Sequence, residues 1–341
     1  MSDRIRLALL GTGGISQAAH IPAWKQIPEV EIVALAEPDP ARRQRALELL
    51  GDPEGAQIAA YTDGDELFAA VQPDLVDITI PPGPAKERAI RTALAAGCHV
   101  TCQKPFTLDE ATARALVQGA AARGRILSVN QQARWAGAFA RARQRIVDGS
   151  LGELRTIQLW ADFRNGGPMQ WLYYSVHSFD LIRFWAGREP KRVLAWHKPQ
   201  TVQGHYLLAV WLDFDGVLAA QIWDEMSSST TLRWGFRLMG SGGTLRGHEA
   251  FGSRMFPAEV IFTPAGTLGE LVEPVPERYI PDAFRAYFSA LVAAVTGRGP
   301  VPTPAADNLK TLRLAFAARE AASQGSWVEV NLDGLAEAGS L

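Results

Sequence analysis

Cysteine, unbalanced charge and long apolar stretches are all scarce in this sequence. The 341 residues include only two cysteines, Cys98 and Cys102, too few for a disulfide framework or a zinc site, so we expect no metal and a cytoplasmic protein with reduced thiols. Lysine and arginine number 34 against 36 acidic residues, and this balance argues against nucleic acid as a partner. No apolar run reaches the roughly 18 residues that a membrane span needs. The short apolar stretch near the N-terminus does not predict a signal peptide.

What is present is typical of an ordered globular protein of about two domains. Apolar residues make up 47% and charged residues 21% of the chain. In the first 130 residues, short apolar runs alternate with stretches rich in alanine, arginine, leucine and glutamate. This alternation predicts βαβ units that form a doubly wound parallel sheet with helices on both faces. The apolar runs stand at 7–10, 32–36, 75–80, 99–102 and 126–129.

The second part of the chain has a different pattern, in which strand-like runs follow one another with turn signals between several of them. The expected strands are 154–163, 193–196, 206–214, 217–223, 231–238 and 258–262. One helix is expected at 175–185 and two more at 281–295 and 305–324. We therefore predict an α/β domain at 1–130 and an α+β domain at 131–341, the latter with a mostly antiparallel sheet, and its last helices able to pack back on the first domain.

A glycine-rich turn follows the first apolar run and predicts dinucleotide binding. Gly11 permits the tight turn, Gly13 lets the backbone approach a pyrophosphate, and Gly14 and Ile15 lead into a helix whose N-terminus favours an anion. Ser16 is small enough for close packing of that helix. The motif is weak alone, but the strand before it and the helix after it are the context that it requires.

An acid at the end of the next apolar run supports this interpretation and bears on the choice of cofactor. Glu37 is placed to accept hydrogen bonds from the ribose hydroxyls of an adenosine, and a carboxylate there favours NAD over NADP. Arg42 and Arg43 follow closely and keep NADP open, because arginine can bind a 2′-phosphate. Pro81, where prolines end the run at 74–80, is predicted to belong to the same cofactor site.

Further motifs follow in an order that points to one family. His20 stands after the glycine turn, residues 93–105 read Ala-Leu-Ala-Ala-Gly-Cys-His-Val-Thr-Cys-Gln-Lys-Pro, and a His-Ser-Phe-Asp run begins at His177. Other matching segments stand at 134–135, 148–152, 166–168 and 240–245. Together they resemble the Gfo/Idh/MocA oxidoreductases, the family of glucose–fructose oxidoreductase and inositol dehydrogenase, over nearly the whole chain.

The resemblance implies a fold, an activity and an assembly. The family has an N-terminal Rossmann domain and a C-terminal domain built on a large open sheet. One face of that sheet usually packs against another subunit, which implies a homodimer or homotetramer. The implied activity is NAD(P)-dependent transfer of hydride between nicotinamide and a hydroxyl carbon of a sugar, polyol or cyclitol.

The resemblance also implies roles for individual residues. Lys104 aligns with the family's catalytic lysine, which hydrogen-bonds the reacting hydroxyl and helps to move its proton beside the cofactor. Lys104 also ends an apolar strand, where ligands bind in open α/β sheets, and desolvation there would lower its pKa. His177 aligns with the catalytic-site histidine, and Asp180 is placed to orient its ring. Arg134 matches an arginine near cofactor and substrate. The predicted substrate site therefore consists of Lys104, Arg134, Tyr173, His177 and Asp180.

Two positions depart from the family pattern. Gln103 stands where glutamate is usual, and because a neutral glutamine favours the charged lysine less, we expect Lys104 to be a readier base than in relatives. The resulting Gln-Lys-Pro motif is similar to that of family members that oxidise aldoses to lactones, such as apiose-type dehydrogenases. Tyr173 stands where aspartate is usual. On a helix it lies four residues before His177 and faces the same way, which suits either a catalytic role toward a substrate hydroxyl or a packing role.

Two other functions remain open from the sequence. One is a glycosidase of the same family that retains NAD, and the other is a non-catalytic sensor that binds a dinucleotide. Several further residues receive structural interpretations. Lys86 is expected on a helix surface, Trp160 and Trp171 either stack on a ligand ring or are buried, and His205 and His248 are expected to be structural.

Overall fold

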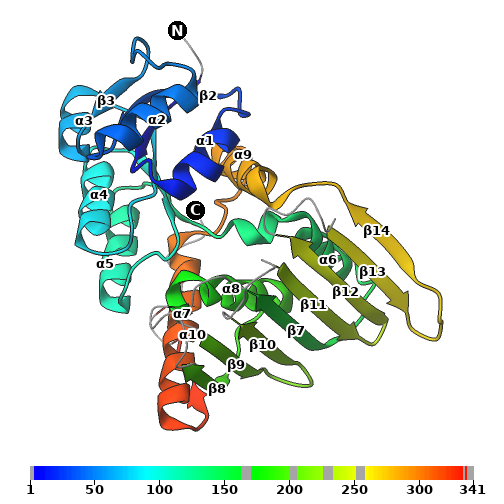
Figure 1. Ribbon diagram of the computed structural model, residues 1–341. Coiled ribbons are helices and arrows are strands. Elements are labelled where there is room, and N and C mark those ends of the chain that lie inside the picture. Colours follow the sequence, from blue (N-terminus) through cyan, green and yellow to red (C-terminus); the bar gives the residue numbers. More distant parts are fainter. Residues whose placement is uncertain are drawn as a thin grey trace. The chain divides into compact units, whose positions relative to one another are not determined.

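The structure is a computed structural model that describes residues 4–162, 170–199, 206–225, 233–250, 258–332 and 335. Contacts between Cα atoms divide the described chain into two compact units (Figure 1). The first unit contains residues up to 132, the segment 280–309 and residue 335. The second contains residues 133–279 and 310–332 as far as they are described. The first unit thus includes a late segment of the chain as well as the whole N-terminal part.

The first unit is built on a six-stranded parallel sheet, in the order β3-β2-β1-β4-β5-β6. The strands are β1 (Ile5–Leu10), β2 (Val30–Ala36), β3 (Ala59–Tyr61), β4 (Leu75–Ile78), β5 (His99–Gln103) and β6 (Leu127–Asn130). All four residues of β4 and all four of β6 are buried, as expected for strands covered on both faces. The predicted doubly wound parallel sheet is confirmed. The short strand β3 was not predicted from the sequence.

Two groups of helices cover this sheet. The helix after the glycine turn continues through η1 (Ser16–His20) into α1 (Ile21–Trp24), which contacts α2 (Pro40–Leu50) and α9 (Phe284–Val295). On the other side, α4 (Pro84–Ala95) contacts α3 (Gly64–Ala70) and α5 (Glu110–Ala121) (Figure 1). Asp39, Asp63 and Asp109 start three of these helices by accepting hydrogen bonds from backbone N–H groups of the first turn.

The second unit is built on a nine-stranded sheet, in the order β14-β13-β12-β11-β7-β10-β9-β8-β15. Every neighbouring pair is antiparallel except β7 and β10, so the predicted mostly antiparallel sheet is confirmed. The strands are β7 (Leu154–Asp162), β8 (Arg192–Pro199), β9 (Tyr206–Asp213), β10 (Ala219–Glu225), β11 (Arg233–Gly240), β12 (Gly243–Ala250), β13 (Ala258–Pro264), β14 (Leu271–Val275) and β15 (Val328–Glu329). Of these, β12, β14 and β15 were not predicted.

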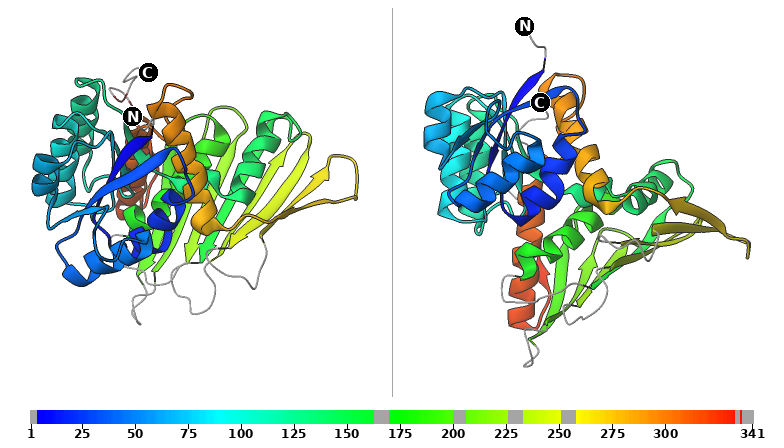
Figure 2. Two further views of the ribbon diagram at one scale, coloured as in Figure 1. Left: turned by 90° about the horizontal axis from the view of Figure 1, so that it is seen from above. Right: turned by 45° about the horizontal axis from the view of Figure 1, so that its top comes forward.

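Helices of the second unit pack on one face of this sheet. The helix α6 (Gly137–Val147) contacts β12 and β13, and α8 (Ser175–Ala186) contacts β7 and β10. Figure 2 shows both helices on the same side of the strands. The remaining helices among the described residues are α7 (Gln170–Tyr173), the short segments η2 (Gln132–Trp135) and η3 (Tyr279–Ala283), and α10 (Ala305–Gln324). No helix in the described part of the chain combines the length and apolar character that crossing a bilayer requires.

Candidate functional site

A cavity of about 650 Å³ lies at the carboxyl ends of the strands of the first unit. Six residues predicted to bind the cofactor line it, namely Gly11, Gly13, Gly14, Ile15, Glu37 and Pro81. The structure therefore brings together segments that follow three different strands. Lys104 and Arg134, which were also predicted to contact the cofactor, are not among the lining residues of this cavity.

The glycine turn leaves the space that a dinucleotide backbone needs. Gly11 has φ of +82°, and a Cβ there would lie 3.1 Å from the backbone nitrogen of Ile80. A Cβ built on Gly13 or Gly14 would meet no atom within 4 Å, so these two positions face open space at the start of the helix. A side chain at either position would fill part of the cradle. The residues present thus fit a bound pyrophosphate.

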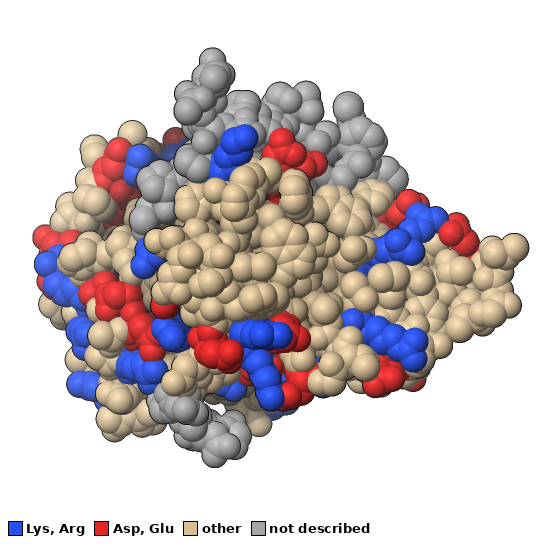
Figure 3. Space-filling view, turned by 90° about the horizontal axis from the view of Figure 1, so that it is seen from below, with Lys and Arg blue, Asp and Glu red and all other residues tan. Residues whose placement is uncertain are grey.

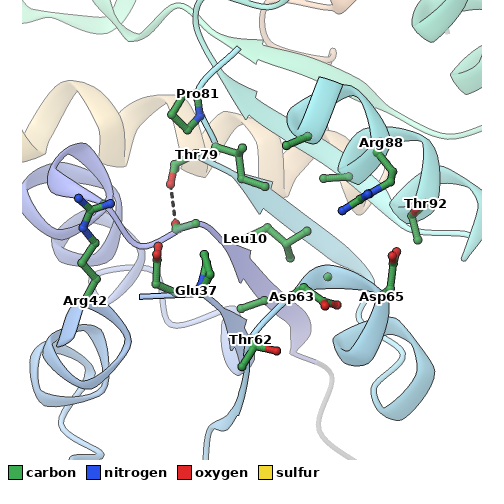
Figure 4. A pocket seen from close by; sticks show the side chains of 18 of the residues that line it. Leu10, Glu37, Arg42, Thr62, Asp63, Asp65, Thr79, Pro81, Arg88 and Thr92 are labelled. Carbon is green, nitrogen blue, oxygen red and sulfur yellow. Dashed lines mark hydrogen bonds between the residues drawn. The ribbon is translucent and has the colours of Figure 1, made fainter. Parts of the chain in front are cut away.

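Glu37 is buried and fixed at the end of β2 (Figure 4). Its Oε2 accepts a hydrogen bond from the backbone N–H of Thr12 at 2.7 Å, and its Oε1 accepts one from Asp39 N–H at 3.2 Å. The carboxylate is therefore held against the glycine turn. Arg43 donates to the carbonyl of Glu37 at 2.6 Å, whereas Arg42 lines the cavity. Of the two arginines, only Arg42 lines the cavity and is placed to contact a ligand that binds there.

The other side of the cavity contains residues that sequence reasoning missed. Thr62, Asp63 and Asp65 come from the segment after β3, and Arg88 and Thr92 come from α4 (Figure 4). Asp63 is a helix N-cap that accepts a hydrogen bond from Glu66 N–H, and an aspartate three residues before a glutamate is a signal of a helix start that the sequence contains. The three-residue strand before it is too short for a periodicity signal, so the segment could not be placed next to the glycine turn.

Lys104 lies directly after β5, where the sequence placed it, and it is partly exposed. Burial lowers the pKa of its ammonium to about 8, and the charge of Lys86 contributes in the same direction. The backbone N–H of Lys104 donates to Oε1 of Gln103 at 2.6 Å. The Gln103 side chain is therefore bonded to the peptide that carries Lys104.

The expectation that Lys86 lies on a helix surface is wrong. Its side chain is 1% exposed, and Nζ donates hydrogen bonds to the carbonyls of Gln103 and, at 2.6 Å, of Pro105. Lys86 stands in the first turn of α4, and the chain between β5 and α5 supplies the acceptors. Carbonyls brought near by the fold cannot be read from the local sequence, and for this reason the sequence of a helix with a lone lysine predicts a solvated side chain.

In the second unit, the expectation that Tyr173 and His177 share one helix is wrong. The helix α7 ends at Tyr173, Tyr174 leaves the helical region with φ of −126°, and α8 begins at Ser175. The i, i+4 relation on one helix face therefore does not apply. His177 is buried, and its ring meets Trp234 edge-on at a centroid distance of 5.6 Å. The glycines at 166 and 167 and His205 lie outside the described residues.

The structure brings Arg134 and Asp180 together. Nε and Nη2 of Arg134 donate to the two carboxylate oxygens of Asp180 at 2.6 and 2.7 Å. The hydroxyl of Thr311 also donates to Asp180, at 3.1 Å. Asp180 is buried and the Arg134 side chain is 15% exposed, so this is a largely buried, bidentate ion pair.

The other residues singled out in the sequence are two tryptophans, a histidine and the two cysteines. Trp171 is buried, whereas Trp160 is 40% exposed on the sheet face away from α8. His248 lies on β12. Cys98 and Cys102 are buried free thiols, and the described residues contain no group of three or more side chains suited to hold a metal ion.

Comparison with known protein families identifies the family to which this chain belongs. Residues 5–131 match a family model described as an oxidoreductase family with an NAD-binding Rossmann fold, and residues 143–330 match the model of the same family's C-terminal alpha/beta domain. The chain belongs to the Gfo/Idh/MocA oxidoreductase family. The family resemblance and fold class predicted from the sequence are thereby confirmed, and the cavity of the first unit lies in an NAD-binding domain.

Individual Gfo/Idh/MocA relatives show the extent of the likeness. A D-apiose dehydrogenase from Paraburkholderia graminis is 34% identical over 149 residues, which is 44% of this chain and 38% of that protein. An inositol 2-dehydrogenase from an Arthrobacter species is 33% identical over 198 residues, 55% of this chain and 56% of that protein. The chain thus spans about half or less of these curated relatives. A solved oxidoreductase from Agrobacterium radiobacter, in complex with NAD+, L-tartaric acid and magnesium, has the same fold, with a TM-score of 0.82 over 96% of this chain and 98% of that one at 21% identity.

Proposed function

We propose that this protein is an NAD-dependent oxidoreductase that transfers hydride between nicotinamide and a hydroxyl carbon of a sugar, polyol or cyclitol. The observation that supports this most directly is Lys104, an amine at the carboxyl end of a strand of the NAD-binding domain whose pKa is lowered to about 8. The names of relatives that oxidise D-apiose and inositol support the substrate class.

In this proposal the glycine turn binds the pyrophosphate and Glu37 receives the adenosine ribose hydroxyls. When bound, the nicotinamide ring accepts or donates the hydride. Lys104 accepts the proton of the reacting hydroxyl during oxidation and returns it in the reverse reaction. With a pKa of about 8, a substantial fraction of its amine is neutral near pH 7.5 and able to accept that proton. An ordinary lysine, with a pKa near 10.4, would be almost entirely charged there.

The roles of the second unit are part of the same proposal. His177 and Tyr173 are proposed to contact the substrate hydroxyls, with proton transfer through the imidazole as the role of His177. For Arg134 and Asp180 the bidentate ion pair supports a shared role, in which each keeps the other in place for ligand binding.

The test combines cofactor binding with a substrate screen. Purified protein is titrated with NAD, and NADH formation is then followed over aldoses, polyols and cyclitols. We expect NADH with at least one sugar class. In Lys104→Met we expect the rate to fall by at least about a hundredfold while the Kd for NAD changes less than about threefold.

Three results would contradict the proposal or part of it. Cleavage of a chromogenic glycoside with no net NADH would instead favour an NAD-retaining glycosidase. Tight NAD binding with neither reaction over the whole panel would favour a dinucleotide sensor. An unchanged rate in Lys104→Met would remove the proposed role of Lys104 whatever the substrate.

We also propose that the protein forms a homo-oligomer through the open face of the nine-stranded sheet. Alternate residues of β10 point away from α8, and Trp223 among them is 42% exposed. It lies in register with Trp160 on β7, and Trp196 and Trp211 on the neighbouring strands are 48% and 39% exposed. Figure 3 shows a broad uncharged area on the side of the molecule seen from below. A clustered aromatic face of this kind is typical of an interface.

A packing detail supports this use of the face. Gly235 lies in register with Trp160, and a Cβ on it would fall within 2.1 Å of the Trp160 ring. Because Gly235 has no side chain, the indole of Trp160 lies over β11 and enlarges the apolar surface of the sheet. We expect a dimer or tetramer in sedimentation velocity, and a shift toward monomer in Trp223→Glu. Val217→Glu, in a turn where Val217 is 58% exposed, is the control. A wild-type monomer at all concentrations would contradict the proposal.

Cytoplasmic location stays part of the proposal. Its support is that Cys98 and Cys102, the only cysteines of the sequence, are both free and buried.

A further inference from the structure

A buried amine is bonded to the backbone on both sides of Lys104. Lys86 is 1% exposed, and its Nζ donates to the carbonyl of Gln103 on one side of Lys104 and to that of Pro105 on the other. Lysine is strongly hydrated and almost never fully buried, because its charge must leave water. A neutral donor would be enough to attach α4 to this segment. A fully buried lysine at this point therefore calls for an explanation of its own.

We propose that Lys86 is a positioning residue, which holds the backbone carbonyls of Gln103 and Pro105 on either side of Lys104 and places its own positive charge beside the Lys104 side chain. This inference rests on the function proposed above for Lys104. It concerns a residue that the sequence placed on the surface.

The backbone contacts support the positioning part. Lys86 holds the carbonyls of Gln103 and Pro105, and the Gln103 side chain accepts a hydrogen bond from the N–H of Lys104. The peptide group before Lys104 is therefore bonded at its carbonyl by Lys86 and at its N–H by the Gln103 side chain, and Lys86 also holds the carbonyl of Pro105 beyond Lys104. The direction in which the Lys104 side chain leaves the strand is set by these bonds rather than by a free loop.

The neighbouring titratable groups support the electrostatic part. Asp77 on β4, Cys102 on β5, His20 on η1 and Tyr287 on α9 surround this region. Burial raises the pKa of Cys102 to about 11 and that of Tyr287 still further, so both are neutral near pH 8. The Asp77 carboxylate is bonded by His20 and Trp24.

In this proposal the charge on Lys86 is the one that acts directly on Lys104. Burial lowers the pKa of Lys104 first, and the positive charge of Lys86 lowers it further. Burial also lowers the pKa of Lys86 itself, while Cys102 and Asp77 act in the opposite direction and favour its charged form. Losing the Lys86 charge should therefore raise the pKa of Lys104.

The experiment measures the titration of Lys104 without using activity. Trace labelling with 1-fluoro-2,4-dinitrobenzene from about pH 6 to 10, followed by peptide mass spectrometry, gives the pKa of each accessible lysine, and the chain contains only six lysines. We compare wild type with Lys86→Met, Lys86→Arg and Lys25→Met. The last variant removes a lysine charge from an exposed site of the same unit.

We expect the pKa of Lys104 to rise by roughly one unit in Lys86→Met and to stay near its wild-type value in Lys86→Arg and Lys25→Met. If Lys86→Met does not fold, Lys86→His provides a folded alternative that is mostly uncharged at pH 8. An unchanged Lys104 titration in every folded variant that lacks the charge would overturn the proposal.

A second readout separates this inference from the proposed function. The acid limb of the kcat/KM profile should move to higher pH by the same amount as the labelled pKa, with the Kd for NAD unchanged. A merely structural role would lower kcat equally at all pH values and leave the limb in place. If labelling shows the shift but no substrate is oxidised, the electrostatic role of Lys86 stands and the proposed function fails.

Discussion

Nδ1 of His20 lies 2.7 Å from Oδ2 of Asp77, and both side chains are buried. The same carboxylate oxygen accepts a hydrogen bond from the indole N–H of Trp24 at 2.7 Å. Because an ionised carboxylate only accepts, Nδ1 of His20 carries the hydrogen and Nε2 is left as an acceptor. Nε2 then takes a hydrogen bond from the Gln103 amide at 3.1 Å, and this orients Gln103 Oε1 toward Lys104 N–H.

This relay predicts the effect of restoring an acid at position 103. In Gln103→Glu, a carboxylate would face the lone pair of His20 Nε2, and the contact is satisfied only if a proton is taken up there. The folded variant then binds one more proton than the folded wild type, while the two unfolded chains bind equal numbers above about pH 5, so the variant's free energy of unfolding falls relative to wild type as pH rises. We expect its stability relative to wild type to fall by up to about 4 kcal/mol from pH 6 to pH 9, measured by urea unfolding.

The matched control is Gln103→Met, which removes both hydrogen bonds without adding charge. It should be destabilised by a similar amount at every pH. If Gln103→Glu and wild type keep a constant difference from pH 6 to 9, the assignment of the hydrogens in the relay is wrong. The pH profile of activity in Gln103→Glu also tests the prediction that a neutral residue at position 103 makes Lys104 a readier base.

Glu37 predicts the choice between the two nicotinamide dinucleotides. Its carboxylate is fixed against the glycine turn by Thr12 N–H and would repel a 2′-phosphate, while Arg42 lines the cavity nearby. In Glu37→Gln we expect the ratio of the Kd for NADP to the Kd for NAD to fall by about tenfold or more. Calorimetric titration measures both constants. Adding Arg42→Ala should abolish the gain for NADP, and an unchanged ratio in Glu37→Gln would argue against this role.

The ion pair of Arg134 and Asp180 predicts a large loss of stability when one partner is removed. Asp180→Asn removes the carboxylate charge that faces a mostly buried guanidinium, which we expect to cost about 3–5 kcal/mol in free energy of unfolding. Asp213→Asn is the control in the same unit, because the Arg192–Asp213 pair is exposed and its loss should cost less than about 1 kcal/mol. Equal losses in the two variants would contradict the assignment.

The sequence predicted the parts of the fold in which local pattern and burial agree. The strands of the parallel sheet are apolar throughout, because helices cover both faces, and each was found within a few residues except β3. Strand β12 was missed for a physical reason. Its buried positions include Glu249, whose carboxylate accepts a hydrogen bond from Ala138 N–H at the start of α6. An inward-facing acid breaks the alternation of apolar and polar residues by which strands are recognised.

The candidate site shows the same limit. Gly11, Gly13 and Glu37 could be found because strand, turn and acid follow each other closely along the chain. Lys86 could not, since its acceptors lie at residues 103 and 105 and only the fold brings them to α4. The start of α8 at Ser175 agrees with the predicted helix, whereas the four-residue helix α7 before it is too short for a periodicity signal and was not predicted.

Asp224 gives the second unit a pH dependence of its own. It is fully buried on β10, where it accepts a hydrogen bond from Ser178 at 3.1 Å. Burial raises its pKa from 3.8 to about 7, the hydroxyls of Ser175 and Ser178 offset part of this, and the carboxylate of Asp162 adds to it. Between about pH 4 and 7 the folded state therefore holds a proton that the unfolded state has lost, and stability falls as pH rises through this range.

Asp224→Asn should remove this dependence, because the amide is neutral at every pH and can still accept the hydrogen bond of Ser178. We expect the variant to gain stability relative to wild type as pH rises from 5 to 8, by up to a few kcal/mol, with the difference level above pH 8. Urea unfolding across this range measures it, and Asp213→Asn, at an exposed position, should leave the wild-type slope unchanged. A wild-type slope that persists in Asp224→Asn would mean that another group takes up the proton.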